Sequence, residues 1–137
     1  MENSINDILQ AVRGADVHFI RLQFVDIFGK MKNLAIIESR LEQALREGVV
    51  FDGSAMDGPQ REKPRRLLLM PDRDTFSLLP WRPQQGSVAR LICDVYTLDG
   101  VPYQGDSRQV LKQQVEALGK DGYRMDIENE IEFFLLN

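Results

Sequence analysis

Residues 17–26 alternate between two faces, and this pattern constrains the fold more than any other part of the sequence. One face carries mainly apolar side chains, as expected for a β-strand with a single buried side. Its members are His18, Ile20, Leu22, Phe24 and Asp26. A turn over residues 27–29 and a second strand over residues 30–37 follow, so residues 17–37 are predicted to form a β-hairpin.

A helix and several short strands are predicted after the hairpin. Residues 39–47 have helical spacing with Leu41, Ala44 and Leu45 facing inward, and Gly48 is placed to end the helix. The predicted strands, each bounded by turn residues, are 49–51, 67–70, 75–79 and 88–96. The order strand, strand, helix and then strands fits an α+β fold, the ubiquitin-like β-grasp, in which a small mixed sheet curls around one helix.

One further helix is predicted on each side of this domain. Residues 4–12 have apolar positions at helical spacing and Ser4 can cap them, which predicts a short, marginal helix. Asp106 and Gln109 form a capping-box pattern in front of the other helix, which Gly119 is expected to end. The apolar face of that helix comprises Val110, Leu111, Val115 and Leu118.

The last nine residues, 129–137, are predicted to form a strand. One helix and one strand cannot close a core, because the strand would leave two unpaired edges. We therefore divide the chain into a short N-terminal helix at 1–15, a β-grasp domain at 16–97 and the truncated start of a second, α+β domain at 98–137.

The charge balance disfavours a nucleic-acid partner, and the absence of long apolar runs argues against a membrane protein. The sequence has 17 basic and 21 acidic residues, and its net charge of -4 disfavours nonspecific nucleic-acid binding. No apolar run approaches the length of a membrane span, and the N-terminus lacks the basic start of a signal peptide. The single cysteine, Cys93, is expected to be an inert buried thiol in a cytoplasmic protein.

Asp52 is the first candidate for chemistry. It follows the apolar residues 49–51, precedes Gly53, and lies just before a polar, proline-bounded loop at 59–66. A carboxylate held at the end of a buried strand beside an exposed loop is well placed for catalysis. An Asx turn that merely closes the strand explains the same residues, and on these residues alone that structural interpretation is favoured.

Glu130 and Glu132 are the second candidates. They lie two positions apart on the last predicted strand, so their carboxylates would share one face about 7 Å apart. Ile131, Phe133 and Leu135 would anchor the other face in a core. Mg²⁺ or Mn²⁺ would offset the repulsion between the two carboxylates, since hard cations prefer oxygen ligands. A half-exposed edge strand with ordinary charges is the alternative, and the spacing alone favours it.

Six segments of the sequence form a series in a fixed order. They are FIRLQFVDIFGKMKN (19–33), FDGS (51–54), PD (71–72), PW (80–81), ARLICDVY (89–96) and EIEFFL (130–135). In order and approximate spacing the series resembles the N-terminal part of type I glutamine synthetase, over nearly all of the chain. The resemblance implies an ATP-dependent ligase that joins ammonia to glutamate through γ-glutamyl phosphate and uses Mg²⁺ or Mn²⁺.

The resemblance also implies an arrangement of subunits and roles for three residues. Enzymes of this family are homo-oligomeric rings, here expected to be a dodecamer, in which the β-grasp domain packs against the catalytic domain of the next subunit. The aspartate that matches Asp52 lines the neighbour's active site and takes a proton from ammonium. The glutamates that match Glu130 and Glu132 are ligands of the nucleotide-side and glutamate-side metals. The remaining ATP, glutamate and metal segments of the family lie beyond residue 137, so this chain is expected to be inactive alone.

The loop after Asp52 departs from the family pattern and leaves alternatives open. Many relatives have serine at the position of Ala55, a bulky aromatic residue at Pro59 and acidic residues where this chain has 63–66. These departures favour a related ligase that joins glutamate to an organic amine. The arginine that matches Arg61 takes part in feedback inhibition by glutamine in some relatives. A non-catalytic β-grasp interaction module is the third interpretation, although the trailing helix and strand argue against it.

Overall fold

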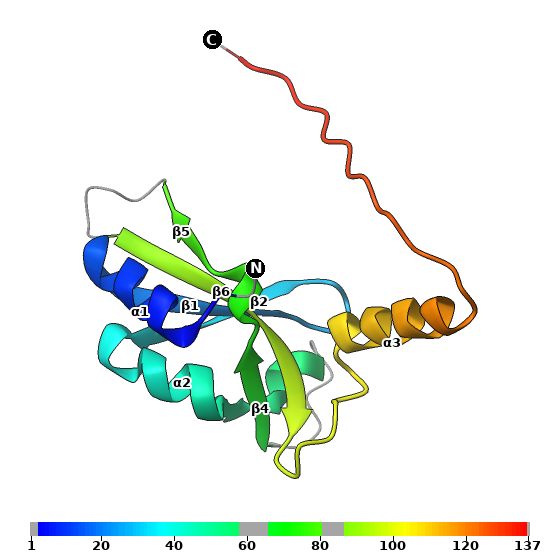
Figure 1. Ribbon diagram of the computed structural model, residues 1–137, viewed down its shortest axis with the longest axis horizontal. Coiled ribbons are helices and arrows are strands. Elements are labelled where there is room, and N and C mark those ends of the chain that lie inside the picture. Colours follow the sequence, from blue (N-terminus) through cyan, green and yellow to red (C-terminus); the bar gives the residue numbers. More distant parts are fainter. Residues whose placement is uncertain (1–2, 58–65, 81–86, 137) are drawn as a thin grey trace.

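The computed structural model describes residues 3–57, 66–80 and 87–136 (Figure 1). Its helices and strands, in chain order, are α1 (Ile5–Gly14), β1 (Val17–Val25), β2 (Met31–Ile37), α2 (Leu41–Glu47), β3 (Val49–Asp52), β4 (Arg66–Pro71), β5 (Ser77–Leu79), β6 (Ser87–Thr97) and α3 (Ser107–Lys120). Short 3-10 helices lie at Glu38–Arg40, Gly53–Asp57 and Arg73–Thr75. No helix in the described part of the chain is long and apolar enough to cross a membrane.

The predicted hairpin is confirmed. Strands β1 and β2 are antiparallel, with Phe19 opposite Ile37 and Val25 opposite Met31. From Ile20 onward, alternate side chains of β1 are buried in the core, as predicted, whereas His18 on the same predicted face is exposed. Val17 departs from strict alternation, because a register shift in the pairing with β6 at this point turns its side chain toward the core as well.

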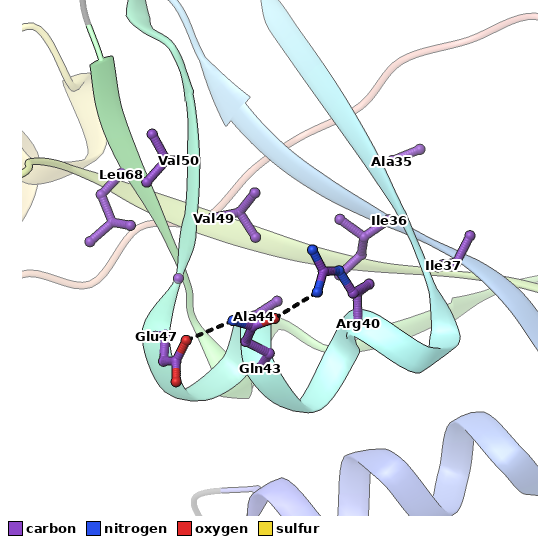
Figure 2. A pocket seen from close by; sticks show the side chains of 11 residues that line it. Ala35, Ile36, Ile37, Arg40, Gln43, Ala44, Glu47, Val49, Val50 and Leu68 are labelled. Carbon is purple, nitrogen blue, oxygen red and sulfur yellow. Dashed lines mark hydrogen bonds between the residues drawn. The ribbon is translucent and has the colours of Figure 1, made fainter.

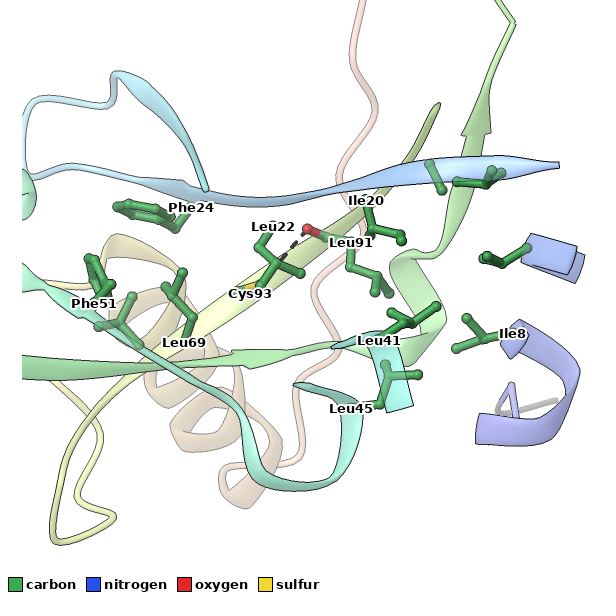
Figure 3. Close-up of a cluster of buried hydrophobic side chains, with 14 of the residues drawn as sticks. Ile8, Ile20, Leu22, Phe24, Leu41, Leu45, Phe51, Leu69, Leu91 and Cys93 are labelled. Carbon is green, nitrogen blue, oxygen red and sulfur yellow. Dashed lines mark hydrogen bonds between the residues drawn. The ribbon is translucent and has the colours of Figure 1, made fainter. Parts of the chain in front are cut away.

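The strands form one mixed sheet in the order β2-β1-β6-β4-β3, with β5 pairing beside β6. Strands β1 and β6 are parallel and the other pairs are antiparallel. Figure 3 shows side chains from the sheet and from α1 and α2 meeting in one core, including Ile8, Leu22, Leu41, Leu69 and Leu91. Because α2 packs against this mixed sheet, the predicted β-grasp fold is confirmed.

Helix α2 is confirmed, with a short 3-10 turn in front of it. Leu41, Ala44 and Leu45 are buried as predicted. Gly48 follows the helix with a φ of 74°, the left-handed conformation that glycine adopts without steric cost. A Cβ atom at Gly48 would lie 2.7 Å from the backbone oxygen of Leu69, so the turn into β3 has no room for a larger residue.

The strand predicted at 75–79 is shorter in the structure. Residues 73–75 form a 3-10 turn, and β5 begins only at Ser77. The Asp72 carboxylate accepts a hydrogen bond from the Asp74 amide at 3.1 Å and caps this turn. The Thr75 hydroxyl donates to the Asp72 carbonyl at 2.6 Å and accepts from the Ile92 amide at 2.7 Å. These side-chain hydrogen bonds give backbone amides and carbonyls the partners that strand pairing would otherwise supply.

Two predictions about α3 are wrong in detail. The capping box does not form: the Asp106 carboxylate accepts a hydrogen bond from the Arg108 amide at 3.0 Å, but the Asp106 amide donates to the Tyr103 carbonyl at 3.0 Å and not to the Gln109 side chain. The helix also continues past Gly119 to Lys120. The left-handed residue is Gly122, and the amides of Gly122 and Tyr123 donate back to the carbonyls of residues 119 and 118, which ends the helix.

The strand predicted at 129–137 is absent from the described residues, which reach 136. Figure 1 shows this segment running away from the body of the fold without regular structure. Ile131, Phe133 and Leu135 are 83%, 73% and 89% exposed, so their predicted anchoring in a core is wrong here. A strand needs a partner to satisfy its amides and carbonyls, and no described strand lies beside this segment.

Candidate functional site

Asp52 is the last residue of β3, an edge strand of the sheet. The preceding residue, Phe51, is buried, and its ring lies 4.9 Å from that of Phe24 on β1 at an angle of 57°. Asp52 itself is exposed and lies opposite Arg66 in the pairing with β4. Burial of the neighbouring ring therefore fixes the end of β3 while the carboxylate faces outward.

The chain turns directly after Asp52. Its carboxylate oxygen Oδ1 accepts a hydrogen bond from the Ser54 amide at 3.0 Å, so the predicted Asx turn is present. Gly53, Ser54 and Met56 are buried, which holds the following 3-10 helix against the core. A turn of this kind restrains the carboxylate without removing it from the surface. The structural and catalytic interpretations of Asp52 are therefore compatible.

A second aspartate, Asp26, organises the turn between β1 and β2. It is only 2% exposed, and its Oδ1 accepts hydrogen bonds from the amides of Phe28 at 3.0 Å and Lys30 at 2.9 Å. The Lys32 ammonium lies 3.4 Å from Oδ2. Burial acts to raise the pKa of Asp26, but the two amides and the lysine outweigh burial and hold this pKa below the ordinary aspartate value.

The sequence pattern had placed Asp26 on the buried face of β1 without giving it a role. Asp26 and Gly29 occupy the first and fourth positions of a four-residue turn, the positions where aspartate and glycine are favoured. This spacing is a signal that could have identified the turn-forming carboxylate. The Ile27 amide in the same turn donates to the Met56 carbonyl at 3.1 Å, which joins the hairpin to the segment after Asp52.

A cluster of charged side chains joins α3 to the sheet. Arg108 contacts the carboxylates of Asp72 and Asp94, the latter at 2.8 Å, and Lys112 also contacts Asp94. The buried Asp106 accepts a hydrogen bond from the Val95 amide at 2.8 Å. No local sequence pattern predicts these contacts, because the partners lie 11 to 36 positions apart in the chain.

Burial is the main influence on the pKa of Asp106 and raises it above the ordinary aspartate value. The nearby Asp94 carboxylate acts in the same direction, while the amides of Val95 and Arg108 partly offset both. Burial also raises the pKa of the Cys93 thiol, in keeping with the predicted inert cysteine. Neither group lies beside Asp52 in the sequence or shares its turn.

Glu130 and Glu132 are exposed on the irregular C-terminal segment. Figure 1 shows that segment extending away from the sheet that carries Asp52, so the structure does not bring the predicted site residues together. Within the described ranges, no three histidine, cysteine, aspartate or glutamate side chains gather as a metal site would require. Pro59, Arg61 and positions 63–65 lie outside the described residues.

A groove of about 630 Å³ lies between β2, α2 and β3 (Figure 2). Its walls combine apolar side chains, with Ile36 and Val49 among them, and polar groups. At its rim, Gln43 accepts a hydrogen bond from Arg40 at 3.1 Å and donates one to Glu47 at 2.9 Å. The polar groups of the rim thus bond one another, and none of the residues predicted for chemistry lines this groove.

The sheet order and the enclosed helix define the class of β-grasp domains, and comparison with known proteins narrows this class to a family. Residues 16–98 match the family described as "Glutamine synthetase, beta-Grasp domain". The chain belongs to this family.

Curated relatives extend the similarity to almost the whole chain. A glutamine synthetase from Clostridium saccharobutylicum is 51% identical over 129 residues, which cover 94% of this chain and 29% of the relative. A glutamine synthetase from Methanosarcina mazei is 46% identical over the same number of residues, again 94% of this chain and 29% of the relative. The chain thus spans less than a third of the length of these relatives.

Solved structures share the fold at lower identity. The structure titled "GmaS/ADP complex-Conformation 1" has a TM-score of 0.73 at 22% identity and covers 85% of this chain and 26% of that one. A glutamine synthetase from Plasmodium falciparum has a TM-score of 0.73 at 17% identity, covering 89% of this chain and 24% of that one. At these identities the likeness supports the fold alone.

Proposed function

We propose that this chain is the N-terminal part of a glutamine synthetase, an ATP-dependent ligase that joins ammonia to glutamate through γ-glutamyl phosphate. The observation that carries the proposal is the 51% identity to a curated glutamine synthetase across 94% of the chain. In this proposal residues 1–15 are a leading segment that contains α1, 16–97 are the β-grasp domain and 98–137 are the start of the catalytic domain. The chain alone is inactive, because the rest of the catalytic domain supplies the nucleotide and glutamate sites.

Asp52 is the catalytic residue of this region. Ammonium must lose a proton before its nitrogen can attack the acyl phosphate, and a carboxylate both attracts the cation and accepts the proton. The exposed position of Asp52 at the end of β3 suits a group that reaches into a neighbouring subunit. The hydrogen bond from the Ser54 amide to Oδ1 restrains the Asp52 carboxylate, so the side chain loses less conformational freedom when it binds ammonium.

Glu130 and Glu132 are proposed as ligands for Mg²⁺ or Mn²⁺ in the complete enzyme. Carboxylate oxygens suit these ions, but a full shell takes about six ligands and the described residues offer no third group near the pair. The present chain therefore fits only part of such a site. When bound, the ion would neutralise phosphate charge during phosphoryl transfer.

The complete protein is proposed to form a homo-oligomeric ring in the cytoplasm, with twelve subunits, so that Asp52 of one subunit serves the next. Exposed apolar side chains on α3, such as Leu111 and Val115, support the burial of this helix against further structure. Arg61 is proposed to take part in regulation by glutamine. Ammonia is favoured over an organic amine as the acceptor, because the curated relatives above are named glutamine synthetases.

The test is Asp52→Asn in the full-length protein, with ADP release and glutamine formation followed separately at saturating ammonium. Asparagine keeps a side-chain oxygen for the Ser54 amide but lacks the charge and the base. We expect phosphorylation of glutamate to continue while glutamine formation falls by about 100- to 10,000-fold. Near-normal glutamine formation by a variant with an unchanged melting temperature would make Asp52 a structural residue. If the parent enzyme formed an amide only with an organic amine, the acceptor would be that amine and not ammonia.

A further inference from the structure

The hairpin turn between β1 and β2 holds the segment that follows Asp52. We propose that Asp26 is a positioning residue for the amination step: it fixes the turn whose Ile27 amide anchors residues 53–57, and thereby sets the direction of the Asp52 carboxylate. This inference rests on the proposed role of Asp52 as the base.

Asp26 closes the turn from within. Its Oδ1 accepts hydrogen bonds from the amides of Phe28 at 3.0 Å and Lys30 at 2.9 Å. The Asp26 amide donates a hydrogen bond to the Lys30 carbonyl at 3.0 Å. The Gly29 amide donates to the Asp26 carbonyl at 3.0 Å. Every amide from residue 28 to residue 30 is therefore bonded inside the turn. Removal of the carboxylate would leave two of these amides without their acceptor.

The Ile27 amide donates its hydrogen bond to a residue outside the turn. It bonds the carbonyl of Met56 at 3.1 Å, and the Met56 side chain is fully buried. Because the neighbouring amides are engaged by Asp26, the orientation of the Ile27 peptide depends on that carboxylate. The turn and the 3-10 helix after Asp52 are thus coupled through one backbone hydrogen bond and a buried side chain.

The β1–β2 hairpin supports Asp52 at two points, one on each side of Asp52 in the sequence. Phe24 packs on Phe51, the residue before Asp52, and the Ile27–Met56 bond holds the segment after it. Strands β1 and β3 are not neighbours in the sheet, so these contacts do not belong to the strand ladder. They form a separate connection between the hairpin and the end of β3.

The kinetic test uses Asp26→Ala and Asp26→Asn in the full-length protein. A displacement of about 1 Å at a reacting group costs up to about 100-fold in rate, so we expect Asp26→Ala to lower kcat for glutamine formation by about 10- to 100-fold. The KM for ATP and the rate of ADP formation in the first turnover, which precedes amination, should stay near the parent values. Asp26→Asn keeps an oxygen for the two amides and should recover most of the rate. Asp7→Ala is the control: it removes a carboxylate of α1 that accepts a hydrogen bond from the amide of Ser4, the residue before the helix, and it should leave glutamine formation unchanged.

A double variant separates positioning from general stability. If Asp26 acts through Asp52, Asp26→Ala should have almost no further effect on glutamine formation in an Asp52→Asn background. Hydrogen exchange should also show faster exchange of the Ile27 and Ser54 amides in Asp26→Ala, with the amides of β6 unchanged. Both results would support the proposal.

Three results would overturn it: an unchanged kcat in Asp26→Ala, an equal loss in both backgrounds, or a matching loss of ADP formation in the first turnover. Failure of the proposed function appears differently, as a parent-like rate of glutamine formation in Asp52→Asn alone. That single variant therefore tests the role of the base, whereas the comparison of the two backgrounds tests the role of Asp26.

Discussion

Gly48 shows how one residue without a side chain allows two elements to meet. The chain leaves α2 and enters β3 at this residue, with a φ of 74° that other residues adopt only with strain. The backbone of Leu69 on β4 passes so close that any Cβ atom at Gly48 would collide with its carbonyl oxygen. Helix end, strand start and sheet packing therefore all depend on the same position.

We expect Gly48→Ala to lower the free energy of unfolding by about 1–3 kcal/mol, from the strained φ together with the collision. Urea denaturation of the variant and the parent chain would measure the difference. Gly119→Ala is the matched control, because Gly119 lies within α3 and a Cβ atom there would meet no other atom within 4 Å. Alanine favours helix by up to about 1 kcal/mol there, so the control should be neutral or stabilising. An equal loss in both variants would contradict this account.

At the scale of the elements, the attachment of α3 to the sheet depends on charge. Its N-terminal end is held by the bond of Asp106 to the Val95 amide of β6 and by the contacts of Arg108 with Asp72 and Asp94. The middle of the helix instead presents exposed apolar side chains. Asp94 is only 7% exposed, so its charge requires partners. The helix is therefore anchored at its N-terminal end.

Replacement of Arg108 by methionine keeps much of the apolar stem and removes the charge. We expect Arg108→Met to lower the free energy of unfolding by about 1–3 kcal/mol and to speed amide exchange in α3 while β1 and β6 keep their protection. Arg46→Met is the control, since its pair with Glu42 is exposed and such pairs contribute about 0.3–0.5 kcal/mol. Unchanged exchange in α3 would show that the bond of Asp106 to the Val95 amide holds the helix without Arg108.

The elements also show what could be predicted from the sequence. The hairpin and α2 follow from local periodicity, and the Asx turn of Asp52 from the pair Asp52-Gly53. The contacts of Arg108 depend on which distant strands become neighbours, which no local pattern contains. The strand expected at 129–137 depends on a partner strand, and its apolar alternation could not supply one. Local sequence signals therefore predict single helices, strands and turns, whereas contacts between distant segments depend on the tertiary fold.

For the molecule as a whole, the candidate site is divided between two parts of the chain. Asp52 belongs to the packed sheet, whereas Glu130 and Glu132 lie on an exposed segment without regular structure. Two carboxylates on such a segment must lose conformational freedom before they can share an ion. The pair alone is therefore a weak ligand.

Calorimetry with Mn²⁺ would test this division on the 137-residue chain. We expect no tight, stoichiometric binding, and heats that match those of the Glu130→Gln/Glu132→Gln double variant, because two carboxylates fill only part of a shell of about six ligands. Tight binding of one Mn²⁺ per chain that disappears in the double variant would contradict the expectation. It would indicate that these glutamates form a site without further domains.

The parallel pairing of β1 with β6 has a consequence for the order in which the protein can be built. Ile20 and Ala89 lie side by side at the centre of the sheet although 68 residues separate them in the chain. During synthesis the hairpin and α2 emerge first, but their apolar faces stay uncovered until β6 has left the ribosome. Such long-range closure slows folding and exposes intermediates to association with other chains. A pause in translation before residue 97 would therefore leave nascent chains dependent on chaperones.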